Sequence, residues 1–505
     1  MRFETVTSLA IVSCAIAACG GSGSSQQTQP IEPELRPQPV LKSFSLLASN
    51  NAELETDLEF NLVGSTFYAR IPDDASVESL VPTFTFEGSR VVSSGVTQIS
   101  GETRQDFTQI LTYQVSNQVG ATKSYSVDLN RFTGLPIIYL TTDEPVTSKE
   151  EYVNGKFRLD GWRNYESVDE MEMKIRGRGN STWAHPKKPY QIKLDSKRSL
   201  LGMEEDKKWL LLAEYSDKSL LRNHLAFYLS SRTTLRWTPS GRFAEVFMNG
   251  KHDGVYHVTE KVEEGSNRVN IGETGFLLEI DQPDRLDPDD VFFRTSTYLV
   301  NVKEPSLDYG DPEFEQIRQH INDFEDVLLG ESFKDPVNGY AAYIDVDSFV
   351  DWFLVNEIAK NVDAQWYSSI FLHYVPGDKI HMGPIWDFDL GFGNVDYADA
   401  TYPERWWVRW NTWISRMLED PAFVLKVKER FASLDAQRPD TIKNIRTWSD
   451  ELSLAQAQND AIWQTLGRYV WPNPIFYDTY EQEVEHLVDW FDTRMDWLAE
   501  AIADL

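Results

Sequence analysis

Residues 41–131 contain short stretches in which apolar and polar side chains alternate. The alternation is clearest in residues 111–115 and 124–129, which are separated by the turn-forming segment 117–121. A period of two is the pattern of a strand with one buried face, and several such strands joined by turns are typical of a small antiparallel sandwich. We therefore predict an all-β sandwich over residues 41–131. No cluster of catalytic residue types lies in this segment, which leaves a spacer or a ligand-binding module as its role.

From residue 135 onward the pattern changes to longer apolar runs mixed with helical spacing. Long apolar runs predict buried strands at 136–142 and 275–281, and residues 209–213 form another apolar run. An Asn-Gly pair in the middle of residues 244–260 predicts a hairpin there. Apolar positions three and four residues apart predict helices at 219–229, 346–360 and 484–502. Together these elements predict a second domain over residues 135–505, of the α+β class and helical toward its C-terminal end.

The N-terminal residues carry the pattern of an export signal. An apolar run at residues 9–18 is too short to span a bilayer and is typical of a signal-peptide core, which predicts a signal peptide at residues 1–18. Ile16-Ala17-Ala18-Cys19 resembles a bacterial lipobox, in which the cysteine is lipidated; an ordinary signal peptide with a chance cysteine is the alternative. Residues 19–40 are rich in Gly, Ser, Gln and Pro, as in a flexible tether.

These features predict an exported protein that touches the membrane only through acyl chains on Cys19. Gly20 after that cysteine fits sorting to the outer membrane or cell surface of a Gram-negative bacterium. The chain has 2 cysteines, Cys14 and Cys19. The folded body therefore has no disulfide, no thiolate metal site and no cysteine nucleophile.

Composition and charge narrow the possible partners. The chain has 505 residues, 41% of them hydrophobic and 13% aromatic, which is enough to form two or three folded domains. The formal net charge of −31 excludes nucleic acid as a partner, because the phosphate backbone would be repelled. It also disfavours electrostatic docking on anionic lipid.

The segment 385–394 places charge inside an otherwise apolar sequence. Asp387 and Asp389 follow Trp386 and precede Gly391 and Gly393. Carboxylates among large apolar side chains are costly to bury without a partner, and they are retained where they hold a hard cation such as Mg²⁺, Mn²⁺ or Ca²⁺. We therefore interpret Asp387 and Asp389 as metal ligands; an acidic strand end followed by a turn is the alternative.

A second carboxylate, Asp363, is expected to reach the same place. Apolar runs at 370–374 and 380–385 are joined by the Pro-Gly turn 375–379, which predicts a hairpin. A hairpin brings its two flanks together, so Asp363 and Asp387 would face one cleft. Protein kinases place a catalytic-loop aspartate and a metal-binding aspartate in this way.

Basic and acidic residues upstream complete a candidate phosphate site. Two glycines between two arginines, opening onto an asparagine, could hold phosphate through backbone N–H groups and guanidinium groups; the residues are Arg176, Gly177, Arg178, Gly179 and Asn180. Lys193, set among apolar residues of a predicted strand, could reach a phosphate, with Lys187 and Lys188 as competitors. Glu260 is the candidate partner of that lysine. The alternatives are that residues 176–180 form a plain hairpin turn, that Lys193 is an exposed strand lysine, and that Glu260 is an acidic strand end.

Several of these segments, taken in order, resemble the CotH family of spore-coat-type atypical protein kinases. They are Arg176-Gly177-Arg178-Gly179-Asn180-Ser181-Thr182-Trp183, Lys187-Lys188-Pro189-Tyr190 with Ile192-Lys193-Leu194, Tyr215-Ser216-Asp217 with Leu221-Arg222-Asn223, Asn249-Gly250 with Gly254-Val255-Tyr256 and Glu260, Asn361-Val362-Asp363, and 386–394. The resemblance covers residue 135 to the C-terminus. Residues 41–131 resemble the Ig-like or cadherin-like repeats placed before catalytic domains on bacterial surface proteins.

The CotH resemblance implies a divergent kinase-like fold, use of ATP with a divalent cation, and phosphorylation of Ser or Thr in secreted or surface proteins. It implies that Asp363 is the catalytic aspartate, that Asp387 is a metal ligand with Asp389 as a second ligand or support, and that Lys193 pairs with the phosphates. By analogy with kinases, the strand that carries Glu279 would meet adenine.

One departure from the family leaves another function open. Ser368 and Ser369 occupy the place where members of the family often carry an asparagine, and a hydroxyl is a weaker metal ligand than an amide carbonyl. The alternative function is a weak or inactive CotH-like adhesion or binding protein with a structural cation, and a carboxylate-pair hydrolase is a third interpretation.

Overall fold

The computed structural model describes residues 38–505, apart from residues 55, 73, 74, 162 and 163. The predicted signal peptide at 1–18, with Cys14, lies outside the described residues. The predicted lipidation site, Cys19, and all but the last three residues of the predicted tether 19–40 also lie outside them.

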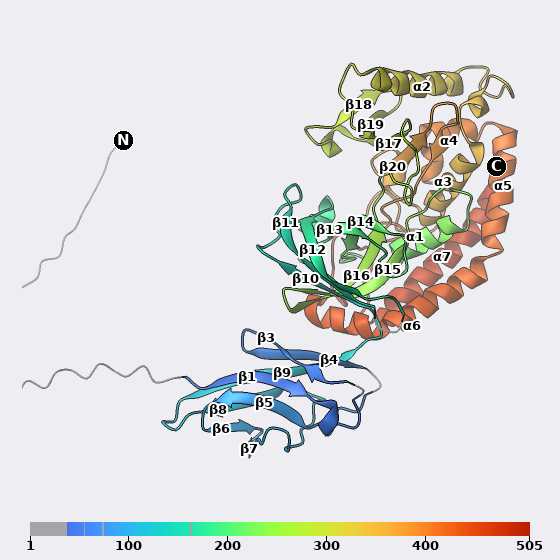
Figure 1. Cartoon of the computed structure of the whole chain (residues 1–505). Helices are drawn as coiled ribbons and strands as arrows, with labels where there is room; N and C mark the ends of the chain where they lie inside the picture. Colours follow the sequence, from blue (N-terminus) through green and yellow to red (C-terminus); the bar gives the residue numbers. More distant parts are fainter. Residues whose placement is uncertain (1–37, 55, 73–74, 162–163) are drawn as a thin grey trace, which may run out of the picture.

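The N-terminal β-rich region is built from two sheets (Figure 1). The smaller sheet has the order β2-β1-β5, with β1 (Val40–Leu46), β2 (Leu58–Glu59) and β5 (Pro82–Glu87). The larger has the order β3-β4-β9-β8-β6-β7, with β3 (Asn61–Val63), β4 (Thr66–Pro72), β6 (Arg90–Ser93), β7 (Val96–Thr97), β8 (Leu111–Ser116) and β9 (Thr122–Phe132).

The inward-facing positions of both sheets form one hydrophobic core. The alternation predicted for residues 111–115 is confirmed, because Tyr113 and Val115 are buried and their neighbours in β8 are not. Phe44 of the smaller sheet packs against aromatic rings of the larger sheet, with centroid distances of 5.0 Å to Tyr113 and 6.0 Å to Phe67. The two sheets are therefore held together mainly by apolar burial.

One strand pair departs from the expected antiparallel arrangement. β4 and β9 run parallel, with Thr66 opposite Ser126. Several strands separate these two in the chain, so no hairpin forces them to be antiparallel. A buried pair at the end of this region, Arg70 of β4 and Glu245 of β15 (N–O distance 2.5 Å), joins it to the next part of the chain.

A closed barrel follows, with the strand order β10-β11-β12-β13-β14-β16-β15. Its strands are β10 (Ile137–Thr142), β11 (Val153–Asp160), β12 (Val168–Gly177), β13 (Tyr190–Arg198), β14 (Asp206–Leu212), β15 (Gly241–Met248) and β16 (Lys251–Glu260). The predicted hairpin at 244–260 is confirmed as β15 and β16, and Asn249 (φ 52°) and Gly250 (φ 76°) make its turn. The barrel closes through the parallel pair β10–β15.

A second sheet lies beside the barrel, in the order β18-β19-β17-β20-β21. It consists of β17 (Phe276–Asp281), β18 (Val291–Arg294), β19 (Leu299–Glu304), β20 (Ile370–Tyr374) and β21 (His381–Met382). β20 and β21 are the hairpin predicted from residues 370–385, with Leu372 opposite Met382.

The C-terminal part is mostly helical (Figure 1). The helices are α1 (Arg222–Ser231), α2 (Pro312–Leu329), α3 (Val346–Ala359), α4 (Thr412–Met417), α5 (Pro421–Asp435), α6 (Arg438–Trp463) and α7 (Tyr480–Ala503). Of these, α6 lies along the barrel beside β16. All three predicted helical segments are helical. α3 is buried almost all round, as expected for a helix at the centre of a core.

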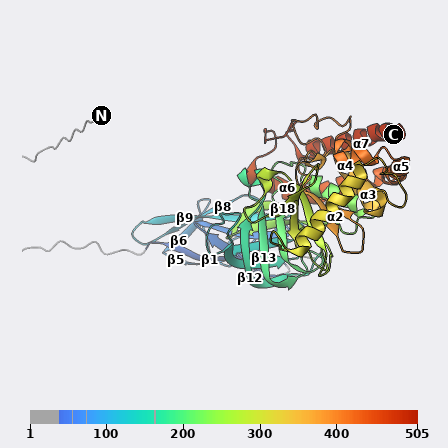
Figure 2. The same ribbon diagram turned by 90° about the horizontal axis from the view of Figure 1, so that it is seen from above.

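The chain is thus multidomain, with a β-rich region at its N-terminal side and a helical part at its C-terminal side. Seen from above, the N-terminal β-rich region extends away from the barrel and the helices (Figure 2). Within residues 38–505, leaving aside the gaps named above, none of the helices is both long enough and apolar enough to cross a bilayer.

Candidate functional site

A cavity of about 420 Å³ lies between the barrel and the second sheet. Its walls come from the end of β12 and the turn after it, from β13 and β14 with the segment after β14, and from the connection between β16 and β17 with the sheet that follows. Residues 363–369 and 386–390 complete the walls. The polar residues that line it include Arg176, Arg178, Asn180, Lys187, Gln191, Glu214, Lys261, Glu263, Glu279, Arg285, Lys303, Asp363, Ser368, Ser369, Asp387 and Asp389.

The three predicted aspartates all lie on the wall of this cavity. Asp363 begins the short helix η5 (Asp363–Gln365), which comes soon after α3. The hairpin of β20 and β21 then returns the chain so that Asp387 and Asp389 meet Asp363. The sequence expectation that a hairpin would bring Asp363 and Asp387 to one cleft is therefore confirmed.

The backbone at Asp387 is held in an unusual conformation. Its φ of 67° lies in the left-handed region, which costs a non-glycine residue about 1–2 kcal/mol. Two hydrogen bonds fix it: Asn361 Nδ2 donates to the Asp387 carbonyl (3.2 Å), and the Phe388 N–H donates to Asn223 Oδ1 (2.8 Å). The surrounding fold thus imposes the strain, which is common where a side chain must be aimed at a ligand.

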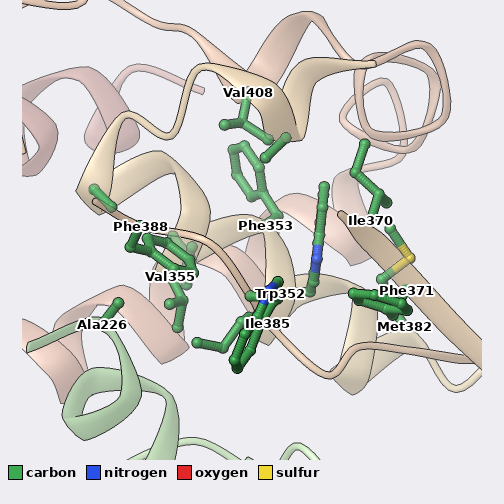
Figure 3. Close-up of a cluster of buried hydrophobic side chains, with 14 of the residues drawn as sticks. Ala226, Trp352, Phe353, Val355, Ile370, Phe371, Met382, Ile385, Phe388 and Val408 are labelled. Atoms are coloured by element: carbon green, nitrogen blue, oxygen red, sulfur yellow. The ribbon is translucent and has the colours of Figure 1, made fainter. Parts of the chain in front are cut away.

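Apolar packing on either side of Asp387 anchors the segment. Ile385 and Phe388 are fully buried. Figure 3 shows them with Trp352, Phe353 and Val355, which belong to α3. The carboxylate between them is exposed toward the cavity. Large apolar neighbours therefore act as anchors that leave the charged group free to bind.

Crowded carboxylates dominate this end of the cavity. Burial, and then the charge of Asp387, raise the pKa of Asp363 to about 7. Burial, followed by Asp387 and Glu214, raises the pKa of Asp389 well above its usual range. Burial, and then Asp217, raise the pKa of Glu214 to about 8. Each shift means that a negative charge here lacks enough compensating positive charge.

This donor set fits a magnesium-type cation that is shared with a phosphate ligand. Across the described residues, no group of three or more His, Cys, Asp or Glu side chains is arranged to hold a metal ion by itself. Mg²⁺ is usually bound through one or two carboxylates, with phosphate oxygens and waters filling the other positions. Asp387 and Asp389 meet that requirement.

Glu214 was not predicted from the sequence. It is 7% exposed, lines the cavity, and accepts from Asn223 Nδ2 at 3.1 and 3.2 Å. Because Asn223 also holds the Phe388 N–H, it links Glu214 to the Asp387 segment. A usable signal existed, since Glu214 directly follows the apolar run at 209–213.

Positive charge is supplied by the turn after β12. Arg176, Arg178, Gly179 and Asn180 all line the cavity, as predicted. Burial lowers the pKa of Arg178, and the charges of Asp387, Asp389 and Glu214 oppose this.

Gly177 has a packing role instead of lining the cavity. It is absent from the cavity wall. A Cβ at this position would lie 2.4 Å from the ring of Trp183, so only glycine lets that ring pack against the turn.

Two predicted residues, Lys193 and Glu260, lie away from the cavity, and this corrects the expected lysine–glutamate pair. Lys193 is exposed on the outer face of β13, opposite Lys174 and Lys208. Glu260 is buried, accepts from the Ser240 N–H (2.7 Å) and pairs with Arg268 (2.8 Å). The alternation of side chains along β13 shows on which face of the strand Lys193 lies. It does not show that the cavity stops short of Lys193.

Lys187 is a lysine that does line the cavity. It is 1% exposed, donates from Nζ to Asn459 Oδ1 (2.9 Å) in α6, and also donates to the Val255 carbonyl. Burial lowers its pKa to about 7, and the charges of Asp253 and Glu214 oppose this. The competitor named in the sequence analysis therefore occupies the place expected for Lys193.

The far side of the cavity is lined by Glu279 and by the connection Lys261, Val262 and Glu263. Glu279 lies on β17 and faces Lys303 at 3.7 Å. Burial, and then the charge of Asp281, raise the pKa of Glu279 to about 8. Both the predicted strand and the connection before it are therefore positioned to meet a ligand.

Ser368 and Ser369 also reach the cavity wall, just before β20. They share this wall with Asp363, Asp387 and Asp389.

Comparison with known proteins identifies the family. The family model described as CotH kinase protein matches residues 175–498. The chain is 26% identical over 260 residues to inner spore coat protein H of Bacillus subtilis (strain 168), covering 50% of this chain and 68% of the relative. Among solved structures, a candidate glycoside hydrolase from Bacteroides thetaiotaomicron aligns over 58% of this chain and 89% of its own length, with 12% identity. The TM-score of 0.17 is too low to indicate a shared fold. The family match spans more than half of the chain and includes the arginine-rich turn and all three aspartates: this chain belongs to the CotH kinase family.

Proposed function

We propose that this chain is an exported protein kinase that transfers the γ-phosphoryl group of ATP to Ser or Thr hydroxyls of proteins outside the cytoplasm. One observation carries the proposal: Asp363, Asp387 and Asp389 share a cavity wall with Arg176 and Arg178. Carboxylates for a cation on one side, and guanidinium groups for phosphates on the other, are what phosphoryl transfer requires.

In the proposed reaction the acceptor oxygen forms a bond to the γ-phosphorus. The bond from that phosphorus to the β–γ bridging oxygen breaks, its electrons stay on ADP, and the hydroxyl proton passes to Asp363. A pKa of about 7 suits Asp363 to this role, because a general base works best when its pKa is near the operating pH.

The other residues of the cavity would bind and orient ATP. Asp387 and Asp389 would hold a divalent cation, Mg²⁺ or Mn²⁺, which when bound supplies positive charge at the phosphates. Arg176, Arg178 and Lys187 would contact phosphate oxygens. Glu279, with the connection 261–263, would face the nucleoside.

The rest of the chain would place this site outside the cell. In this proposal residues 1–18 are a signal peptide, Cys19 carries acyl chains, 19–40 is a tether, and 41–131 is an Ig-like or cadherin-like spacer before an atypical kinase-like domain at 135–505. Mass spectrometry of the mature protein tests this part, because a diacyl or triacyl group on Cys19 is expected at its new N-terminus.

A second candidate function is a binding protein whose cation is structural. Ser368 and Ser369 favour it, because neither hydroxyl matches an amide as a metal ligand. In that case the cavity would hold a cation and a ligand without transferring phosphate.

Labelled ATP separates the two functions. Wild type should bind ATP only with Mg²⁺ or Mn²⁺, measured by calorimetry, and should transfer γ-labelled phosphate to protein. Asp387→Asn should lose metal-dependent binding, Asp363→Asn should bind ATP and fail to transfer, and the exposed control Asp195→Asn should behave as wild type. Metal-dependent binding without any transfer by wild type would establish the second function instead.

A further inference from the structure

Arg285 lines the same cavity but has no role in the reaction described so far. It is the last residue of the short helix η3 (Pro283–Arg285), which follows β17. Its guanidinium lies over the ring of Tyr367, 4.8 Å from the centroid, and Nη2 donates to the Tyr367 hydroxyl at 3.1 Å. The side chain is 25% exposed.

The short helix that carries Arg285 is fastened to the turn that carries Asp363. Gln282 Nε2 donates to the Trp366 carbonyl (2.9 Å), and the Tyr367 hydroxyl donates to Asp284 Oδ2 (3.1 Å). The Tyr367 N–H in turn donates to the Asp363 carbonyl (2.9 Å). Arg285 and Asp363 therefore belong to one connected unit, and their spacing does not depend on a flexible loop.

The Arg285 guanidinium has an N–H donor without a hydrogen-bond partner. Arg285 Nε is buried without a hydrogen-bond partner, and the Asp284 carboxylate, 4.0 Å away, is too far to accept from it. A buried, unpaired N–H of a charged group is costly, so such a donor is retained where it meets a ligand. Arginine offers five N–H donors in a planar fork that matches phosphate oxygens.

The charge of Arg285 also reaches the reacting carboxylate. The two groups lie close enough for their opposite charges to attract each other. The other cationic residues of the phosphate site, Arg176, Arg178 and Lys187, come from the barrel, whereas Arg285 comes from the side of the second sheet. It is therefore placed to meet a phosphoryl group as that group approaches Asp363.

We propose that Arg285 is a further catalytic residue, whose guanidinium contacts the oxygens of the phosphoryl group during its passage from ATP to the acceptor. The inference rests on the proposed kinase function. Bond making and breaking are as written above. The γ-phosphoryl oxygens carry negative charge throughout, and a fixed guanidinium donates to them most strongly at the transition state.

Kinetics of three variants and a control test this inference. Arg285→Ala should lower kcat about 100-fold and change the KM for ATP less than about threefold, because the contact is made mainly in the transition state. Arg285→Lys should recover only part of the rate, since an ammonium cannot donate through a fork. Tyr367→Phe removes the hydroxyl that accepts from Nη2 but keeps the ring under the guanidinium, so it should lower kcat less than Arg285→Ala does. Arg294→Ala, an exposed arginine on β18, should match wild type.

A binding measurement separates this inference from the proposed function. ADP with aluminium fluoride and Mg²⁺ mimics the planar phosphoryl group, and Arg285→Ala should weaken its binding at least tenfold while ADP itself binds as to wild type. Wild-type rates in Arg285→Ala would overturn the catalytic role of Arg285 but not the proposed function. The same conclusion would follow if the variant bound ADP and the mimic equally weakly and had a lowered melting temperature. A wild type that neither transfers phosphate nor binds the mimic would overturn both proposals.

Discussion

Lowering the pH from about 8 to about 6 should slow the proposed transfer reaction through one side chain, Asp363. Burial, and then the charge of Asp387, raise the pKa of this carboxyl to about 7. A carboxyl with that pKa is about 90% ionised at pH 8 and about 10% ionised at pH 6. Only the ionised form accepts the proton of the acceptor hydroxyl, so kcat/KM should fall about tenfold over this range.

The assay is the initial rate of labelled phosphate transfer at low substrate, measured as kcat/KM. This quantity reports pKa values of the free enzyme, which is the state that the structure describes. The divalent cation is kept in excess at every pH, so that ATP remains in one metal-bound form. Asp363→Asn should lose about 10²- to 10⁴-fold in rate together with the pH dependence, and Asp195→Asn should keep both.

Two results would refute the reasoning. An aspartate with an ordinary pKa of about 4 is ionised throughout this range, so a flat profile between about pH 5 and 8 would mean that Asp363 is neither desolvated nor crowded by Asp387. An unchanged acid limb in Asp363→Asn would mean that another group titrates.

Two further predictions concern a lysine of the cavity and a buried ion pair elsewhere in the fold. In steady-state kinetics, Lys187→Met should raise the KM for ATP at least tenfold. Lys193→Met, the matching change at an exposed lysine of β13, should leave the KM unchanged. Equal effects of the two variants would mean that Lys193 also contacts ATP. Arg494→Met should lower the free energy of unfolding by about 3–5 kcal/mol in urea titrations, because it leaves Glu357 charged at 0% exposure after losing a 2.6 Å partner. Adding Glu357→Gln should restore part of that loss, and a double variant no more stable than Arg494→Met would argue against a buried charge as the cause.

Local patterns in the sequence predicted much of the fold. The Asn-Gly turn and its flanking strands gave the hairpin of β15 and β16, because positive φ at two successive residues is a local requirement. The Pro-Gly turn before β21 likewise led to the meeting of Asp363 and Asp387. Helical spacing marked α7 through the side that it buries, and it also marked α3, although α3 is buried almost all round.

Features that depend on distant parts of the chain could not be predicted in this way. The parallel pair that closes the barrel joins β10 to β15, and nothing local to either strand specifies it. Gln191 and Lys193 share one face of β13, but only Gln191 reaches the cavity, because the cavity's extent is set by other elements. Lys193 was preferred to Lys187 as the lysine of the site, and this choice was wrong. The partner of Lys187, Asn459, lies in α6, far along the chain.

A crystal structure with Mn²⁺ and a non-hydrolysable ATP analogue tests the central claim most directly. We predict an anomalous Mn²⁺ peak bonded to Asp387, the triphosphate between that ion and Arg178, and the terminal phosphate facing Asp363. Mn²⁺ bound away from both Asp387 and Asp389, or an analogue bound outside the cavity, would contradict the account.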